Sequence, residues 1–100
     1  MSDVSVIGKR IREARTRTGL SQRQLGIEAG IDPFSASPRI NQYERGKHTP
    51  DYVTTTRLAK VLGVPTPYLY AEDDDLAEVI LRFGALPKRL KKKALTCMES

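Results

Sequence analysis

The sequence contains one cysteine, one histidine and no tryptophan in 100 residues. The lone Cys97 cannot form an internal disulfide, which fits a reducing compartment. Cys97 and His48 stand 49 positions apart and suggest neither a nucleophile–base pair nor a metal site. No apolar stretch approaches the length of a membrane span, and the N-terminus lacks the apolar segment of a signal peptide. We therefore expect a soluble cytoplasmic protein that is not an enzyme and needs no metal or cofactor.

Charge is distributed unevenly along the chain. The net charge is +5 and the sequence pI is about 9.6, a balance that favours a polyanionic partner. Residues 71–85 carry a net charge of −4, whereas residues 1–50 and residues 86–100 each carry +4. The acidic residues 72–75 lack the spacing of a calcium-binding loop and instead suit the first turn of a helix.

The stretch 37–47 has the pattern of a short, well-delimited helix. Ser37 is a good N-cap, Pro38 suits the first helical position, and Gly46 suits the residue just past the C-terminus. Ile40 and Tyr43 share one face, which we expect to be buried. The remaining face carries the side-chain types that hydrogen-bond base edges in the major groove, namely Arg39, Asn41 and Gln42. A solvated surface helix is the alternative interpretation of this stretch alone.

Other helices are predicted from apolar periodicity and from capping residues. Ser21 and Gln24 form a capping box, Thr49 and Pro50 begin a further helix, and Thr66 and Pro67 begin a short one. Two amphipathic helices follow the acidic segment. The expected helices span 4–18, 21–29, 37–45, 49–62, 66–70, 72–83 and 86–98. This is an all-α fold with one five-helix domain, residues 1–70, and a C-terminal helical extension, residues 71–100.

Residues 7–70 resemble the Cro/repressor (lambda-repressor-like, XRE) helix-turn-helix family. The resemblance covers roughly two-thirds of the chain and rests on the order and spacing of several short motifs. These are Ile7-Gly8-Lys9-Arg10-Ile11-Arg12, Gly19-Leu20-Ser21-Gln22, Leu25, Ala29-Gly30-Ile31, Ile40, Tyr43-Glu44-Arg45-Gly46-Lys47, Pro50, Leu58-Ala59-Lys60 and Leu62-Gly63-Val64.

The resemblance implies a five-helix domain whose second helix crosses the phosphate backbone and whose third lies in the major groove. It implies base contacts from Ser37, Arg39 and Gln42, to which the helix pattern adds Asn41. Phosphate contacts would come from Gln22 and Arg23 on the second helix and from Arg45 and Lys47 after the third. Glu44 is expected to be structural, paired with Arg15 or Arg10. The implied core is Ile11, Leu20, Leu25, Ile40, Tyr43, Leu58, Leu62 and Leu69.

Two features depart from the family pattern. The interval from Gly30 to Ser37 is longer than is usual in the family, as it also is in POU-specific domains, which look like relatives. Phe34 and Ser35 in this interval therefore become candidates to reach the DNA. Pro38 occupies a position where the family often has a polar base-contacting residue; proline cannot donate a hydrogen bond but can touch a thymine methyl group.

The extension carries an apolar stripe formed by Leu76, Val79, Ile80 and Phe83. This stripe can pack on its own domain, form a two-fold dimer interface, or bind a different protein. We expect the dimer interface, with residues 71–100 as the dimerisation element. We interpret the chain as a sequence-specific, dimeric regulator of transcription, a repressor that binds double-stranded DNA at a palindromic operator. The alternative is an antitoxin or co-regulator whose main role is to bind a protein partner through the C-terminal helices.

Overall fold

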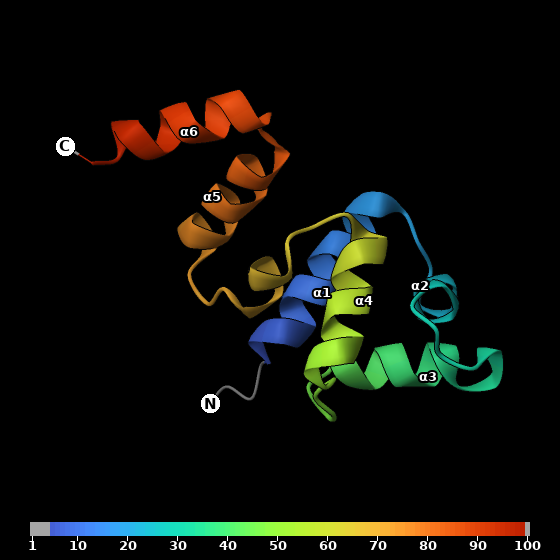
Figure 1. Ribbon diagram of the computed structural model, residues 1–100. Helices are drawn as coiled ribbons and strands as arrows, with labels where there is room; N and C mark the ends of the chain where they lie inside the picture. The colour runs from blue at the N-terminus through green and yellow to red at the C-terminus, as the bar shows by residue number, and fades with distance from the viewer. Residues whose placement is uncertain (1–4, 100) are drawn as a thin grey trace.

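The computed structural model describes residues 5–99 and is all-helical over that range. Figure 1 shows α1, α2, α3 and α4 gathered into one body, with α5 and α6 leading away from it. The elements are α1 (Val6–Thr18), α2 (Gln22–Glu28), α3 (Pro33–Glu44), α4 (Tyr52–Leu62), the 3-10 helix η1 (Thr66–Tyr70), α5 (Asp74–Ala85) and α6 (Lys88–Cys97). The all-α class expected from the sequence is confirmed. No helix among residues 5–99 is long and apolar enough to cross a membrane.

The first two helices follow the capping signals of the sequence. The Ser5 hydroxyl accepts from Gly8 N at the start of α1, while the expected start at Val4 lies outside the described residues. The Ser21 hydroxyl accepts from Gln24 N at 2.9 Å, as the capping pattern predicted. Between α2 and α3 the backbones approach closely, because a Cβ atom added at Gly26 would lie 2.7 Å from the Cβ of Ala36. Glycine is thus required where the two helices cross.

The start of α3 differs from the sequence prediction. Ser37 is not the N-cap; the cap is Asp32, whose carboxylate accepts from Phe34 N at 3.1 Å, and Pro33 takes the first helical position. Pro38 lies inside the helix, where its missing N–H leaves one backbone hydrogen bond unmade. The interval interpreted as a long turn is therefore mostly an added N-terminal turn of α3.

The start of α4 also differs. Thr49 was expected to cap this helix and Pro50 to enter it, but the N-cap is Asp51, whose carboxylate accepts from Thr54 N at 2.8 Å. Pro50 is buried ahead of the helix. The reason is that an aspartate two residues later offers a stronger cap acceptor than the threonine hydroxyl.

The core lies between α1, α2, α3, α4 and η1. Seven of the eight side chains expected there are buried, and Leu20 is partly buried against them. The buried set is Ile11, Leu25, Ile40, Tyr43, Leu58, Leu62 and Leu69, joined by Ile7, Ala14, Ala29, Ala36, Ala59, Tyr68, Ala71 and Ala77. Burial of α3 through Ile40 and Tyr43 fixes which of its faces points outward.

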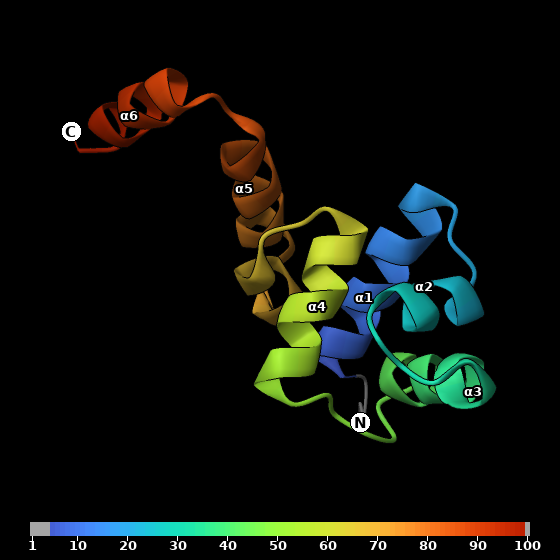
Figure 2. The same cartoon turned by 45° about the vertical axis from the view of Figure 1, so that its right-hand side comes forward.

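The C-terminal extension packs on the domain at its beginning and leaves it at its end. Ala77 of α5 is buried in the core, and Ile80 and Leu81 pack partly against it. A Cβ atom added at Gly84 would lie 2.7 Å from Pro65, so α5 also lies tightly against the segment before η1. Figures 1 and 2 both show α6 beyond the far end of α5, away from α1–α4. None of the α6 residues Lys88–Cys97 is buried.

The apolar stripe that the sequence predicted on α5 is present, but its residues differ in their surroundings. Ile80 turns toward the domain together with Ala77, whereas Leu76 and Val79 remain 51% and 45% exposed. Phe83 is half-buried. One side of the stripe thus meets η1 and the domain, while the other faces outward.

Candidate nucleic-acid interface

The rear of α3 is held by a polar network as well as by the core. Arg15 of α1 donates to both carboxylate oxygens of Glu44, from Nε to Oε2 at 2.6 Å and from Nη2 to Oε1 at 3.1 Å. Gln22 Nε2 donates to the same Oε1 at 3.1 Å and to Asn41 Oδ1 at 3.3 Å. The expected structural role of Glu44 is confirmed, with Arg15 as its partner. These contacts join α1, α2 and α3 into one rigid unit.

The outward face of α3 lies opposite its buried residues Ala36, Ile40 and Tyr43. Helix geometry places Phe34, Pro38, Asn41 and Arg45 in one line on that face. Phe34, Pro38 and Arg45 are exposed, and Asn41 is half-buried because its side-chain oxygen accepts from Gln22. The line places an apolar half at the start of the helix and a polar half at its end.

Arg39 and Gln42 lie on the flank of α3 that faces the loop before α4. Together with Tyr43, His48 and Thr49 they line a surface hollow. Arg39 is exposed and Gln42 half-buried, so both side chains remain accessible to a ligand. Ser37, on the opposite flank, is also half-buried. The four residues predicted to contact bases therefore belong to one helix but lie on different sides of it, and only Arg39 is exposed while the other three are half-buried.

The residues predicted to contact phosphate separate into two groups. Arg23 is exposed at the start of α2, and Arg45 and Lys47 are exposed just past α3. Gln22 differs from these three because its side-chain amide is engaged with Asn41 and Glu44. A left-handed backbone at Gly46, with a φ of 76°, ends α3 and directs the chain toward Lys47, as the sequence predicted.

Arg10 is the one buried arginine among residues 5–99, and the sequence did not predict its partners. Arg10 is 3% exposed; its Nε donates to Ala71 O at 2.8 Å, its Nη1 to Glu13 at 3.0 Å, and its Nη2 to Asp74 at 3.0 Å. Burial opposes its charged form, but the hydrogen bonds with Glu13 and Asp74 outweigh this and raise the pKa of Arg10. The signal in the sequence was position 10, which falls on the buried face between Ile7 and Ala14.

Arg10 joins α1 to the beginning of the extension. Hydrogen bonds from Arg10 and then from Lys9 lower the pKa of Asp74, the first residue of α5. Asp73, just before it, caps α5 by accepting from Leu76 N at 2.8 Å. The acidic segment 72–75 thus holds α5 in place, in addition to complementing its helix dipole.

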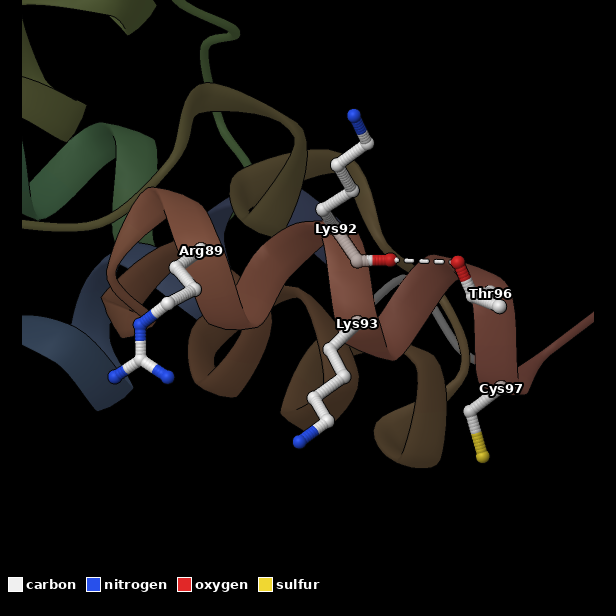
Figure 3. Close-up of a pocket in the computed structure, with 5 residues that line it drawn as sticks. All are labelled: Arg89, Lys92, Lys93, Thr96 and Cys97. Carbon is white, nitrogen blue, oxygen red and sulfur yellow. Dashed lines mark hydrogen bonds between the residues drawn. The ribbon is translucent and has the colours of Figure 1, made fainter.

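The far end of the extension is strongly basic. Figure 3 shows Arg89, Lys93 and Cys97 projecting to one side of α6 and Lys92 to the other, while the hydroxyl of Thr96 donates to the carbonyl of Lys92 at 3.1 Å. These five residues line a shallow surface hollow. The α6 surface is positively charged because lysine and arginine predominate on it.

A metal site is a separate question. In residues 5–99 no three His, Cys, Asp or Glu side chains are grouped so that they could hold a metal ion.

Comparison with known proteins identifies the domain type. A family model described as "Helix-turn-helix domain" matches residues 8–75. Among curated proteins, the SPbeta prophage-derived uncharacterized HTH-type transcriptional regulator YonR of Bacillus subtilis strain 168 is 36% identical over 64 residues, which are 64% of this chain and 56% of YonR. The HTH-type transcriptional regulator ImmR of the same strain is 31% identical over 68 residues, 68% of this chain and 50% of ImmR. The chain thus spans about half the length of these two relatives.

Solved structures extend the similarity to the C-terminal helices. The transcriptional regulator BswR superposes with a TM-score of 0.87 and 49% identity, covering 92% of this chain and 91% of that one. The restriction-modification controller protein C.AhdI from Aeromonas hydrophila superposes with a TM-score of 0.57 and 33% identity, covering 64% of this chain and 91% of that one. The match to BswR is long enough to include most of residues 71–99.

Proposed function

Because this chain belongs to the helix-turn-helix domain family, we propose that it is a transcriptional regulator that binds double-stranded DNA and recognises its sequence with α3. One observation supports the proposal most directly. The rear of α3 is fixed by the core and by the Arg15–Glu44–Gln22 network, while its outward side and the segment after it carry exposed arginine and lysine. A rigid helix with such a surface fits the major groove.

The proposed division of labour follows the positions of the side chains. Arg39 and Gln42 are the principal base-contacting residues, and Ser37 and Asn41 contribute at the flanks of α3. Arg23, Arg45 and Lys47 contact phosphates on either side of the groove, which positions α3 without specifying sequence. Gln22 acts indirectly: its side-chain amide donates to Asn41 and Glu44 and so positions the Asn41 side chain.

We also propose that the protein acts in the cytoplasm as a non-enzymatic homodimer on a palindromic operator, and that it represses transcription. A two-fold dimer would present two copies of α3 to half-sites about one DNA turn, roughly 34 Å, apart. The outward side of α5 supports this assembly, because Leu76 and Val79 are about half exposed and Phe83 lies on the same side.

Charge supports contact between two copies of the extension. The acidic start of α5 and the basic α6 have opposite charge, yet α6 extends beyond the other end of its own α5 (Figures 1 and 2). Complementary contact between α6 and residues 72–75 therefore fits a neighbouring copy better than the same chain. An antitoxin-like or co-regulator role through a different protein partner is the alternative for this surface.

The experiment that tests the function is selection of bound sequences from random duplex DNA by the full chain. A palindromic motif is the expected result. The matched variant is Gln42→Ala, which should cost roughly 1–3 kcal/mol on the selected site and relax preference at one base position of each half-site. Absence of enrichment for any motif contradicts sequence-specific binding. If Gln42→Ala weakens binding equally on all sequences, Gln42 contacts the DNA phosphate backbone and not a base.

A further inference from the structure

Phe34 has an unusual position for a phenylalanine. Its side chain is 95% exposed, more than any other large apolar side chain in the described part of the chain. It stands in the N-terminal turn of α3, and its backbone N–H is held by the Asp32 carboxylate at 3.1 Å. Pro33 immediately before it further restricts the backbone. The ring is therefore presented to solvent from a well-fixed backbone.

A second exposed apolar residue, Pro38, lies near Phe34 on α3. Pro38 is exposed four residues later on the same outward line, followed on that line by Asn41 and Arg45. At 1.5 Å per residue, Phe34 and Pro38 are separated by about 6 Å along the helix axis. The apolar half of the line thus extends over the distance of about two stacked base pairs.

We propose that Phe34 contacts the C5-methyl group of a thymine at one end of each half-site, and that Pro38 contacts a second thymine methyl nearer the centre. The proposal rests on the proposed function, because it requires α3 in the major groove. The thymine methyl is the apolar group that base pairs expose there, and it suits side chains that can neither donate nor accept a hydrogen bond. Arg39 and Gln42 on the adjacent flank then contact the polar base edges.

The electrostatics of the surroundings favour a DNA methyl group over an apolar protein surface as the occupant. Phe34 and Pro38 share their line with Arg45. Arg39 is exposed on the same helix, and Lys47 is exposed just past its end. Cations beside a small apolar patch fit a ligand that offers methyl groups between rows of phosphates. A protein surface that docks on Phe34 is the competing possibility, and the test below distinguishes it.

The test replaces thymines of the selected duplex, one position at a time, with deoxyuridine, which removes only the methyl group. Titration of the full chain should show about fourfold weaker binding at two positions of each half-site, the factor expected for one buried methyl-sized group. For Phe34→Ala the outer substitution should have no further effect while the inner one keeps its effect. For Pro38→Ala the two positions should exchange roles. Phe34→Leu should retain part of the outer effect.

Folding does not confound this comparison, because the side chain of Phe34 buries almost nothing and Phe34→Ala should leave the Tm unchanged. If the wild type is insensitive to every deoxyuridine, or if Phe34→Ala stays sensitive at the outer position, the proposal is wrong. If Phe34→Ala binds all duplexes normally but changes the oligomeric state, Phe34 is a protein contact instead. If neither the wild-type protein nor any variant binds any duplex, the proposed function itself is wrong.

Discussion

Arg15 and Glu44 form a two-point ion pair between α1 and α3, with N–O distances of 2.6 and 3.1 Å. The side chain of Glu44 is only 4% exposed, so its charge is compensated almost entirely by Arg15 and by the Gln22 amide. Arg15 also donates from Nη1 to the carbonyl of Leu20 at 3.0 Å, which fixes the chain just before α2. The Arg15 guanidinium therefore binds both the segment just before α2 and the C-terminal end of α3.

The first prediction concerns this pair. Arg15→Ala leaves a buried carboxylate without its partner, and we expect it to lower the free energy of unfolding by about 3 kcal/mol. The measurement is urea denaturation at neutral pH. Arg12→Ala is the matched control, because it removes the same charge from an exposed position of α1 and should change stability by less than about 0.5 kcal/mol. Equal losses in the two variants would show that the ion pair does not stabilise the fold.

The second prediction concerns phosphate contact by Lys47. Lys47→Ala should weaken binding to the selected site and to random duplex by about the same factor, and it should reduce the slope of log K against log salt by about one unit. Lys60 is the control: it is exposed near the end of α4 that lies far from α3 in Figures 1 and 2. An unchanged salt slope for Lys47→Ala would remove this residue from the DNA interface.

The third prediction concerns acid stability. Because Arg10 and Lys9 lower the pKa of Asp74 in the folded state, its ionised form stabilises the fold. This contribution is complete above the unfolded-state pKa of about 3.9 and is lost as the pH falls through the lower folded-state value. The difference in unfolding free energy between wild type and Asp74→Asn should therefore be constant near neutral pH and shrink below about pH 4.

The difference between the two proteins isolates Asp74 from other groups. The pKa of Asp51 is also lowered, first by its hydrogen bond from the backbone of Thr54, so the wild-type acid transition alone would not identify the responsible residue. A difference that stayed constant down to the lowest pH at which the protein is folded would mean that Asp74 is not ionically coupled to Arg10 in solution.

The fourth prediction concerns the dimer. Val79→Asp places a charge on the outward side of α5 and should convert the full-length protein from dimer to monomer in sedimentation equilibrium without DNA, while circular dichroism stays unchanged. Glu78→Ala, at the exposed neighbouring position, should remain dimeric. If the wild-type protein is already monomeric, the result favours a different protein as the partner of this surface. A Val79→Asp variant that remains dimeric would place the interface elsewhere.

The sequence predicted the helical class, the core side of α3 and the role of Glu44, because apolar periodicity and ion-pair chemistry are local or nearly local signals. It misplaced the start of α3 because two signatures of the same kind, Asp32-Pro33 and Ser37-Pro38, follow each other closely. Capping rules cannot choose between them. The packing of Ala36 against Gly26 shows what does, since this contact requires helix before Ser37.

The two sides of α5 were hidden for a related reason. A helical pattern shows which residues share a face, but it does not show that a second element covers part of that face. Ile80 belongs by sequence with Leu76 and Val79, yet it packs toward the domain with Ala77. The partners of Arg10 could not be predicted in full, because only Glu13 is close to it in sequence; Ala71 and Asp74 lie more than sixty residues away.

Two arginines of α1 hold different parts of the molecule: Arg15 binds α3, and Arg10 binds residues 71–74. If α5 carries the dimer interface, α1 is the single rigid body that sets the distance between the two copies of α3. Besides the Asp74 contact, α5 is held by buried Ala77 and by the close approach of Gly84 to Pro65. Such a dimer would therefore accept one half-site spacing, because α5 has no freedom to adjust it.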